Sequence, residues 1–203
     1  MGKPPTKVVK SLVFPVGSVP ASLILLMKEF RLIVNKSIRV AIAQDCRSKG
    51  KLSKVAYRSL SAEHDIYKQY ISSAFEVAMG AVKAYRTNLR KGRRASIPYL
   101  RRLHMKAENQ SYHLDRDTGE LRIPLDGPGP GRRPAIAGLT LPLSDWHHSI
   151  LSDPSWRLGS INISPDKIIV TVQRGIPKPY APESIIALDT NESSLDGVAA
   201  KGE

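Results

Sequence analysis

The sequence predicts an α+β fold in which a helical block is inserted between one amino-terminal strand and a later run of antiparallel strands. Residues 7–14 are β-branched and aliphatic, residues 20–92 carry apolar side chains three and four positions apart, and short strand-like segments follow residue 95. A lone strand cannot satisfy its backbone hydrogen bonds, so we expect it to pair with strands of the second half. The helices should therefore interrupt a β-barrel or a compact sheet.

Two long helices are expected in the inserted block. Ser18 is expected to cap the first, with Pro20 in its first turn. After residues 48–51 we expect at most a short helical turn, and then a second long helix capped by Ser61 and ended by Gly92. The buried stripe of the first helix should be Leu23, Leu26, Met27, Phe30, Ile33, Val34, Ile38, Ala41 and Ile42.

The second half of the sequence has the residue pattern of short antiparallel strands. Residues 111–114 and 120–124 predict one hairpin, and residues 160–164 and 167–173 predict another. Residues 139–143 are a possible edge strand, and residues 184–189 form an apolar strand signal that ends in Asp189. Trp146 and Trp156 are expected to anchor this part, and the adjacent His147 and His148 do not suggest a metal site.

Positive charge is concentrated in the first 110 residues. The formal charge of the chain is +13, and the first 110 residues contribute +16 of it, against −3 from the rest. Side chains of this kind that neutralise phosphates bind nucleic acid strongly, with little sequence preference and with a marked salt dependence. A solvated basic face is the alternative. The candidate nucleic-acid contacts are the eight basic residues between positions 86 and 106, which are Arg86, Arg90, Lys91, Arg93, Arg94, Arg101, Arg102 and Lys106.

Composition excludes several other classes of protein. The single Cys46 rules out a disulfide framework and a Cys-rich zinc site within this chain, and it fits a reducing compartment. The apolar stretch from residue 20 to residue 46 contains too many charged residues to span a membrane. We therefore expect a cytoplasmic protein without a membrane partner, and the oligomeric state stays open.

Asp189 is the best candidate for chemistry. A carboxylate at the carboxyl end of an apolar strand lies where open sheets place ligand and metal sites, and Mg²⁺ binds such oxygens. On local chemistry alone, an acid at a strand end is more often a turn or cap residue than a metal ligand. To bind Mg²⁺, Asp189 would need at least one further carboxylate from elsewhere in the fold. Glu192 and Asp196 are close to Asp189 in the sequence.

Longer sequence segments resemble a known family. IALDTNESSLDGV at 186–198 resembles the first RuvC-type motif of the transposon-encoded OrfB or TnpB proteins, which are RNA-guided DNA endonucleases related to type V CRISPR effectors. FRLIVNKSIRVAI (30–42), with its internal Asn35, looks like the family's first recognition helix. YISSAFEVAMGAVKAYR (70–86), RKGRRASIPYLRR (90–102), YHLDRDTGELRIPL (112–125) and GSINISPDKIIVTV (159–172) follow in the family's order.

The resemblance implies a fold, a partner and a site. The fold would be a wedge-type antiparallel β-barrel, with its first strand in residues 1–19, an inserted helical recognition lobe at 20–93, and the remainder of the barrel at 94–182. Residues 183–203 would start a RuvC-like (RNase H-like) domain. Such a protein binds guide RNA and target DNA, and it leaves sequence reading to base pairing. Asp189 would be the first catalytic acid and a Mg²⁺ ligand.

The sequence departs from the family after Asp189. Two-metal cleavage needs several carboxylates, and the family's two later acids and Cys-rich zinc ribbon lie well downstream, whereas the chain ends 14 residues after Asp189. We therefore expect the amino-terminal portion of a longer or truncated insertion-sequence nuclease. It should bind nucleic acid without cutting it, so that Mg²⁺ belongs to the full-length family member and no cofactor is expected here.

Two other functions stay open. One is a stand-alone basic RNA-binding protein without a nuclease role, in which Asp189 is merely structural. The reading frame beyond codon 203 distinguishes it from the first hypothesis. The other, a DNA-binding regulator, is weaker because neither a helix-turn-helix spacing nor a zinc finger is visible in the sequence.

Overall fold

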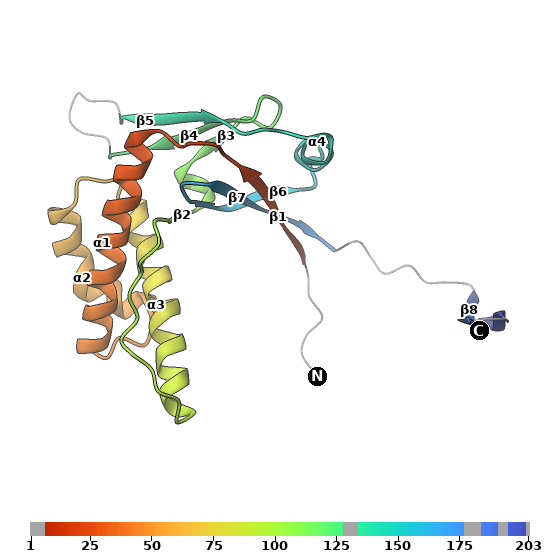
Figure 1. Ribbon diagram of the computed structural model, residues 1–203, viewed down its shortest axis with the longest axis horizontal. Helices are drawn as coiled ribbons and strands as arrows, with labels where there is room; N and C mark the ends of the chain where they lie inside the picture. Colours follow the sequence, from red (N-terminus) through yellow and green to blue (C-terminus); the bar gives the residue numbers. More distant parts are fainter. Residues whose placement is uncertain (1–6, 128–133, 177–183, 191–194, 202–203) are drawn as a thin grey trace.

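The computed structural model describes residues 7–127, 134–176, 184–190 and 195–201 (Figure 1). A helical block lies between the first strand and the later strands, as the sequence predicts. The helices are α1 (Ala21–Ala43), α2 (Lys49–Glu63), α3 (Gln69–Arg90), the 3-10 helix η1 (Asn109–Ser111) and the short α4 (Asp145–Leu151). The strands are β1 (Lys7–Pro15), β2 (Met105–Ala107), β3 (His113–Leu114), β4 (Glu120–Pro124), β5 (Ile136–Thr140), β6 (Arg157–Ile163), β7 (Lys167–Gly175), β8 (Ser184–Thr190) and β9 (Leu195–Lys201).

The first strand pairs with the second half of the chain. β1 and β7 are antiparallel over their whole length, from Lys7 opposite Gly175 to Pro15 opposite Lys167. The strand order of this sheet is β1-β7-β6-β2, so the sheet holds the two ends of the helical block together. The expectation that a lone strand must find its partner after residue 95 is confirmed.

The described strands form open sheets. Besides the four-stranded sheet, β3-β4-β5 form a second antiparallel sheet, and β8 pairs only with β9. None of these sheets closes into a barrel within the described ranges, so the structure is α+β with antiparallel sheets. Both predicted hairpins are present, as β3-β4 and β6-β7, and residues 139–140 belong to the edge strand β5.

The helical block contains three helices where two long ones were expected. Ser18 does not cap α1, whose N-cap is Pro20 without a side-chain hydrogen bond. Ser61 lies in the last turn of α2 and caps nothing; Ser48 is the cap of α2, and its hydroxyl accepts a hydrogen bond from the backbone N–H of Lys51 (3.2 Å). The expected break at residues 48–51 is therefore a helix start, because α2 has its own apolar stripe of Leu52, Ala56 and Leu60.

The apolar stripe of α1 is buried almost as expected. Its predicted members are all buried except Ile42, which is half-buried. α3 ends at Arg90, and Gly92 then has a φ of +66°, a conformation that glycine adopts without strain. The prediction that Gly92 ends this helix is confirmed.

Two buried tyrosine hydroxyls join segments that are distant in sequence. The buried hydroxyl of Tyr70, in the first turn of α3, donates to the backbone carbonyls of Ser111 (3.1 Å) and Pro124 (2.8 Å). Burial raises the pKa of Tyr70 above its ordinary value. Tyr112 donates to the carbonyl of Gly159 (2.9 Å), where the register of β6 shifts, and burial raises the pKa of Tyr112 to about 12.

The second half also contains a helix that the sequence did not predict. Ser144 and His147 form a capping box at the start of α4, and His147 is buried against Phe14 with ring centroids 4.3 Å apart. Trp156 is buried as expected, and the cationic groups of Lys10 and Arg174 both lie over its ring. Trp146 is exposed and does not anchor the core. Among the helices in the described ranges, none combines the length and the apolar character that a membrane span needs.

Candidate nucleic-acid interface

The segment that connects the end of α3 to β2 carries many of the basic residues between positions 86 and 106. We call residues 91–104 the basic strap; it has no regular secondary structure and runs back along the bundle of α1, α2 and α3 (Figure 1). The buried amide of Asn35 on α1 holds its middle. The backbone N–H of Leu100 donates to Asn35 Oδ1 (2.8 Å), and Asn35 Nδ2 donates to the Leu100 carbonyl (3.2 Å). The guanidinium of Arg31 also donates to the carbonyl of Arg101 (3.1 Å).

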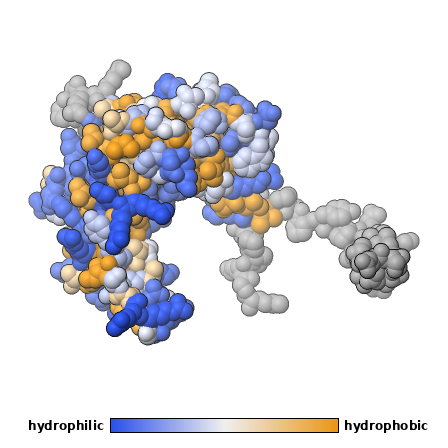
Figure 2. All heavy atoms as spheres, viewed as in Figure 1, coloured by the Kyte–Doolittle hydropathy of each residue, from blue (hydrophilic) through white to orange (hydrophobic). Residues whose placement is uncertain are grey.

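Six of the eight candidate side chains are exposed on or beside this strap. Figure 2 shows hydrophilic side chains gathered at the lower tip of the helical bundle, with apolar patches between them and the sheets. The backbone contacts at Leu100 and Arg101 hold the strap against α1, and the exposed cations lie along the strap and at the end of α3. The six are Arg90, at the end of α3, and Lys91, Arg93, Arg94, Arg101 and Arg102 on the strap.

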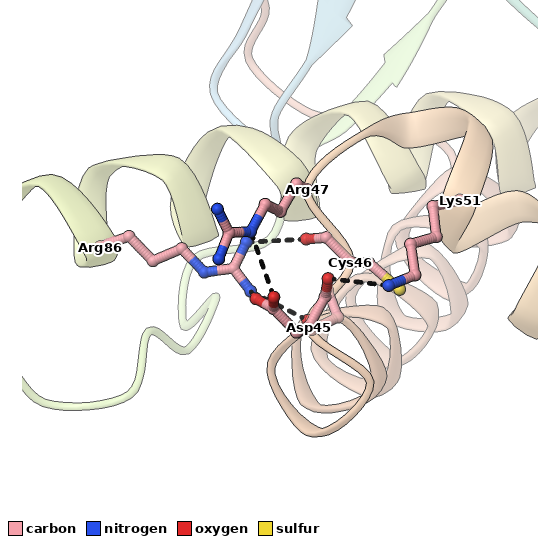
Figure 3. Close-up of polar contacts among 6 residues, drawn as sticks. Asp45, Cys46, Arg47, Lys51 and Arg86 are labelled. Atoms are coloured by element: carbon pink, nitrogen blue, oxygen red, sulfur yellow. Dashed lines mark hydrogen bonds and ion pairs between the residues drawn. The ribbon is translucent and has the colours of Figure 1, made fainter.

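Arg86 has a structural role at the corner between α1 and α2 (Figure 3). Its guanidinium donates to the carbonyls of Cys46 (2.7 Å) and Ala41 (3.3 Å) and to Oδ1 of Asp45 (2.8 Å). The last carbonyls of a helix have no partner within the helix, and α1 has no basic residue in its own last turn. Arg86 therefore supplies from α3 the cation that the end of α1 lacks, and its side chain is only 28% exposed.

The corner itself has the geometry of a Schellman motif. The backbone N–H of Cys46 donates to the carbonyl of Ala41 (2.9 Å), and that of Asp45 donates to the carbonyl of Ile42 (3.3 Å). Asp45 has a φ of +41°, which Asp tolerates better than most residues. A hydrogen bond from Arg47 and the nearby charge of Arg86 lower the pKa of Asp45, so this carboxylate is ionised at neutral pH.

Lys106 is also engaged within the protein. Its ammonium group lies 2.6 Å from Glu76 on α3 and 3.2 Å from Glu108, and its side chain is 20% exposed. Burial alone would lower the pKa of Lys106, but the hydrogen bonds to Glu76 and Glu108 raise it overall. Arg86 and Lys106 thus have carboxylate partners from outside the basic run, and the six exposed cations are the stronger candidates for phosphate contacts.

The fold adds a basic groove that the sequence reading missed. It has a volume of about 870 Å³ and lies between the start of α2 and one face of α3. Its lining includes Met79, Gly80 and Leu89 together with several cations, and Glu76 is the acidic residue of the lining. The cations are Arg47, Lys49, Lys83, Arg86 and Arg90.

Only part of this groove could be inferred from the sequence. Lys83, Arg86 and Arg90 are spaced by three and four residues, which places them on one face of α3. Arg47 and Lys49 are more than 30 residues away and reach the groove because α2 packs against α3. Arg90 lies both in the groove and next to the basic strap, so the two cationic surfaces meet there.

The predicted strand at residues 184–189 is present as β8, which ends one residue later, at Thr190, so Asp189 is its penultimate residue. In the antiparallel register it is opposite Asp196 of β9. Glu192 lies outside the described residues. Within the portion whose side chains are described, no group of three or more His, Cys, Asp or Glu residues is arranged to hold a metal ion. The assignment of Asp189 as a catalytic acid and Mg²⁺ ligand stays a prediction.

One family model matches the chain. It is described as the Uncharacterized protein MJ0013 family, and it matches residues 26–124, slightly less than half of the chain. The matched segment begins within α1 and ends with β4, so it includes α2, α3, the basic strap and the groove. No curated protein is significantly similar to the chain.

Proposed function

We propose that this chain is the guide-RNA and target-DNA binding part of an RNA-guided endonuclease of the transposon-encoded OrfB or TnpB type. In this proposal α1, α2 and α3 correspond to the helical recognition lobe of that family. The sheets β1-β7-β6-β2 and β3-β4-β5 correspond to its wedge-type barrel, and β8 to the first strand of its RuvC-like domain. The order of the resembling segments and the insertion of the helices after β1 support this assignment.

The observation that carries the proposal is the basic strap. It presents exposed cations on a backbone that Asn35 and Arg31 hold against α1, next to a groove with further cations. Cations on an ordered backbone suit phosphate groups at fixed spacing, and such contacts position a nucleic acid without reading its sequence. An RNA-guided protein needs this kind of contact because base pairing supplies the sequence specificity.

Asp189 would supply one carboxylate to the nuclease site of such a protein. Mg²⁺ at that site would activate a water molecule and stabilise the leaving oxygen, and this chemistry needs several converging carboxylates. With only one of the family's three acids among these 203 residues, we expect binding without cleavage. Guided, Mg²⁺-dependent cleavage of target DNA by the purified 203-residue chain would contradict this expectation.

The binding experiment compares two variants with the same change of charge. The first replaces Arg90, Arg93, Arg94, Arg101 and Arg102 with Ala. The matched control replaces five exposed cations elsewhere with Ala, namely Lys28, Arg39, Lys54, Arg58 and Lys167. Arg86 and Lys106 are left intact, because their loss would disturb the fold. Affinity for a structured RNA and for an RNA–DNA heteroduplex is measured by fluorescence anisotropy over a range of salt concentrations.

The strap variant should bind both ligands more weakly than the control variant. Log affinity falls as log salt concentration rises, and each lost phosphate contact should make this slope less steep by about 0.7 to 0.9. Equal affinities of the two variants would reject the strap as the interface. Binding of structured RNA without measurable binding of the heteroduplex would favour a stand-alone RNA-binding protein.

A further inference from the structure

The basic strap exposes apolar side chains among its cations. Ile97 is 59% exposed and Tyr99 is 56% exposed, although Leu100, the next residue, is held against α1 by Asn35. Arg93 and Arg94 precede this pair, and Arg101 and Arg102 follow it. No hydrogen bond or ring contact of the Tyr99 side chain is present within the described ranges.

The backbone of this segment is held rather than free. Both backbone groups of Leu100 are bound by one buried amide, and Pro98 restricts both its own φ and the conformation of Ile97. The conformational entropy of presenting Tyr99 is therefore already lost in the folded protein. A side chain fixed in this way can bind a partner without a further ordering cost to its backbone.

The charge around Tyr99 limits what can cover it. An apolar protein surface would have to desolvate four arginines without neutralising them, which is unfavourable. A nucleic-acid duplex neutralises the arginines, but its bases are stacked and paired, so it offers no free base face along its length. A single strand offers both phosphates and exposed base faces, and aromatic side chains in cationic grooves bind such strands by stacking.

We propose that the basic strap binds an unpaired segment of RNA, with the ring of Tyr99 stacked on a base. Arg93 and Arg94 contact phosphates on one side of that base, and Arg101 and Arg102 contact phosphates on the other. Ile97 covers the edge of the stacked base or its neighbour. This inference rests on the proposed function, because that function supplies RNA as the partner, and it adds that this part of the interface takes single-stranded rather than paired RNA.

The test uses the full 203-residue chain and three variants, which are Tyr99→Ala, Tyr99→Phe and, as a matched control, Tyr57→Ala at an exposed tyrosine of α2. The probes are an unstructured 12-nucleotide RNA with one 2-aminopurine, the DNA strand of the same sequence and a blunt RNA duplex. Affinity is measured by anisotropy, and stacking by quenching of the 2-aminopurine fluorescence. Thermal unfolding verifies that each variant is folded.

Tyr99→Ala should weaken binding of the single-stranded RNA by roughly 5- to 100-fold and abolish the quenching that stacking causes. Tyr99→Phe should retain the affinity and the quenching, since stacking needs only the aromatic ring. Tyr57→Ala should behave as the unsubstituted chain. Binding of the duplex and the salt slope should not change with Tyr99→Ala, because no charge is lost.

Three outcomes would overturn this inference. They are unchanged affinity of Tyr99→Ala for the single strand, equal losses for single strand and duplex, and an effect confined to the DNA strand. The proposed function would survive each of them if the five-arginine variant still loses affinity relative to its charge-matched control. If that variant loses nothing, the proposed function itself fails.

Discussion

Arg86 and Arg90 are one helical turn apart on α3, yet they have different environments. The guanidinium of Arg86 donates to the carbonyl of Ala41 in α1, to that of Cys46 in the α1–α2 corner and to the carboxylate of Asp45. Arg90 is exposed, and its guanidinium donates to the hydroxyl of Thr87 (3.3 Å). Hydrogen bonds from a charged donor to partly buried acceptors contribute more to stability than exposed contacts. Both residues are arginines, so residue type does not show that Arg86 is structural and Arg90 a candidate phosphate contact. The difference arises because the α1–α2 corner lies next to Arg86.

Arg86→Ala should therefore destabilise the fold, while Arg90→Ala should not. The loss of charged hydrogen bonds to partly buried acceptors predicts a decrease of about 1–3 kcal/mol in the free energy of unfolding. Arg86→Lys should recover part of the lost stability, because an ammonium group keeps the charge but lacks the planar guanidinium, which donates to several acceptors at once. Urea denaturation measures the free energies of unfolding of Arg86→Ala, Arg86→Lys and Arg90→Ala. Equal stabilities of Arg86→Ala and Arg90→Ala would contradict this role.

His104, at the end of the basic strap, should make stability depend on pH. Burial lowers the pKa of His104 below its ordinary value, and a hydrogen bond to the backbone of Arg102 opposes part of this effect. The unfolded chain then binds the proton at a higher pH than the folded protein does. The free energy of unfolding should consequently fall as the pH decreases through about 6.5, the ordinary pKa of histidine.

The replacement His104→Gln should reduce this dependence. Urea midpoints at pH 7.5 and pH 5.5 should differ less in the variant than in the unsubstituted chain. His113→Gln, at an exposed site, is the control. A pH dependence that His104→Gln leaves intact would show that another group is responsible.

At the scale of elements, the basic strap is a loop that behaves as part of the helical bundle. Its order comes from α1, because Asn35 lies within the buried stripe of that helix and its amide replaces the missing backbone partners of Leu100. A buried polar side chain in an apolar stripe is unfavourable unless it is hydrogen-bonded. The position of Asn35 is thus explained by the loop that it holds, whose charges form the candidate interface.

Asn35→Ala should release the middle of the strap. The backbone groups of Leu100 would lose their partners, which predicts a loss of about 1–3 kcal/mol in stability. Amide exchange at Leu100 and tryptic cleavage after Arg101 should both become faster. Leu32→Ala, at an exposed position of the same helix, should change neither rate. Unchanged exchange at Leu100 in Asn35→Ala would contradict the anchoring role.

At the scale of the whole molecule, β1 joins the start of the chain to β7, which follows the helical block. Its residues pair with β7 across more than 150 positions of sequence, and Phe14 stacks on His147 of α4. Closing such a long loop has an entropic cost, which the buried side chains of β1 must offset. Leu12 and Phe14 are both fully buried.

Phe14→Ala should therefore be among the most destabilising single substitutions in the chain. Truncation of a buried Phe removes about 3–5 kcal/mol, a large share of the ~5–15 kcal/mol that stabilises an ordinary domain. Val13→Ala, at the neighbouring exposed position of β1, should change stability by only about 0.5 kcal/mol. Thermal and urea unfolding measure both variants, and similar effects of the two would show that β1 does not anchor the core.

The elements themselves were predictable to different degrees. α1, β1 and the two hairpins follow from the spacing of apolar residues and from turn residues, and each was expected near its observed position. α2 was missed because a lysine-rich start with Gly50 resembles a break, and its cap Ser48 was not recognised. α4 was missed because seven residues are too few for a periodic pattern to stand out.

The amino-acid sequence is sufficient to predict that one strand precedes a helical insertion, that antiparallel strands follow, and that positive charge is concentrated before residue 110. These properties depend on local periodicity and on composition, and neighbouring residues suffice to establish them. The folded chain was needed to show that Arg86 and Lys106 have carboxylate partners and that Arg47 and Lys49 join Lys83 at one groove. It was also needed to show that Tyr99 is exposed on a backbone held by Asn35. The physical reason is that these contacts join residues distant in sequence, and the packing of the helices sets which of them meet.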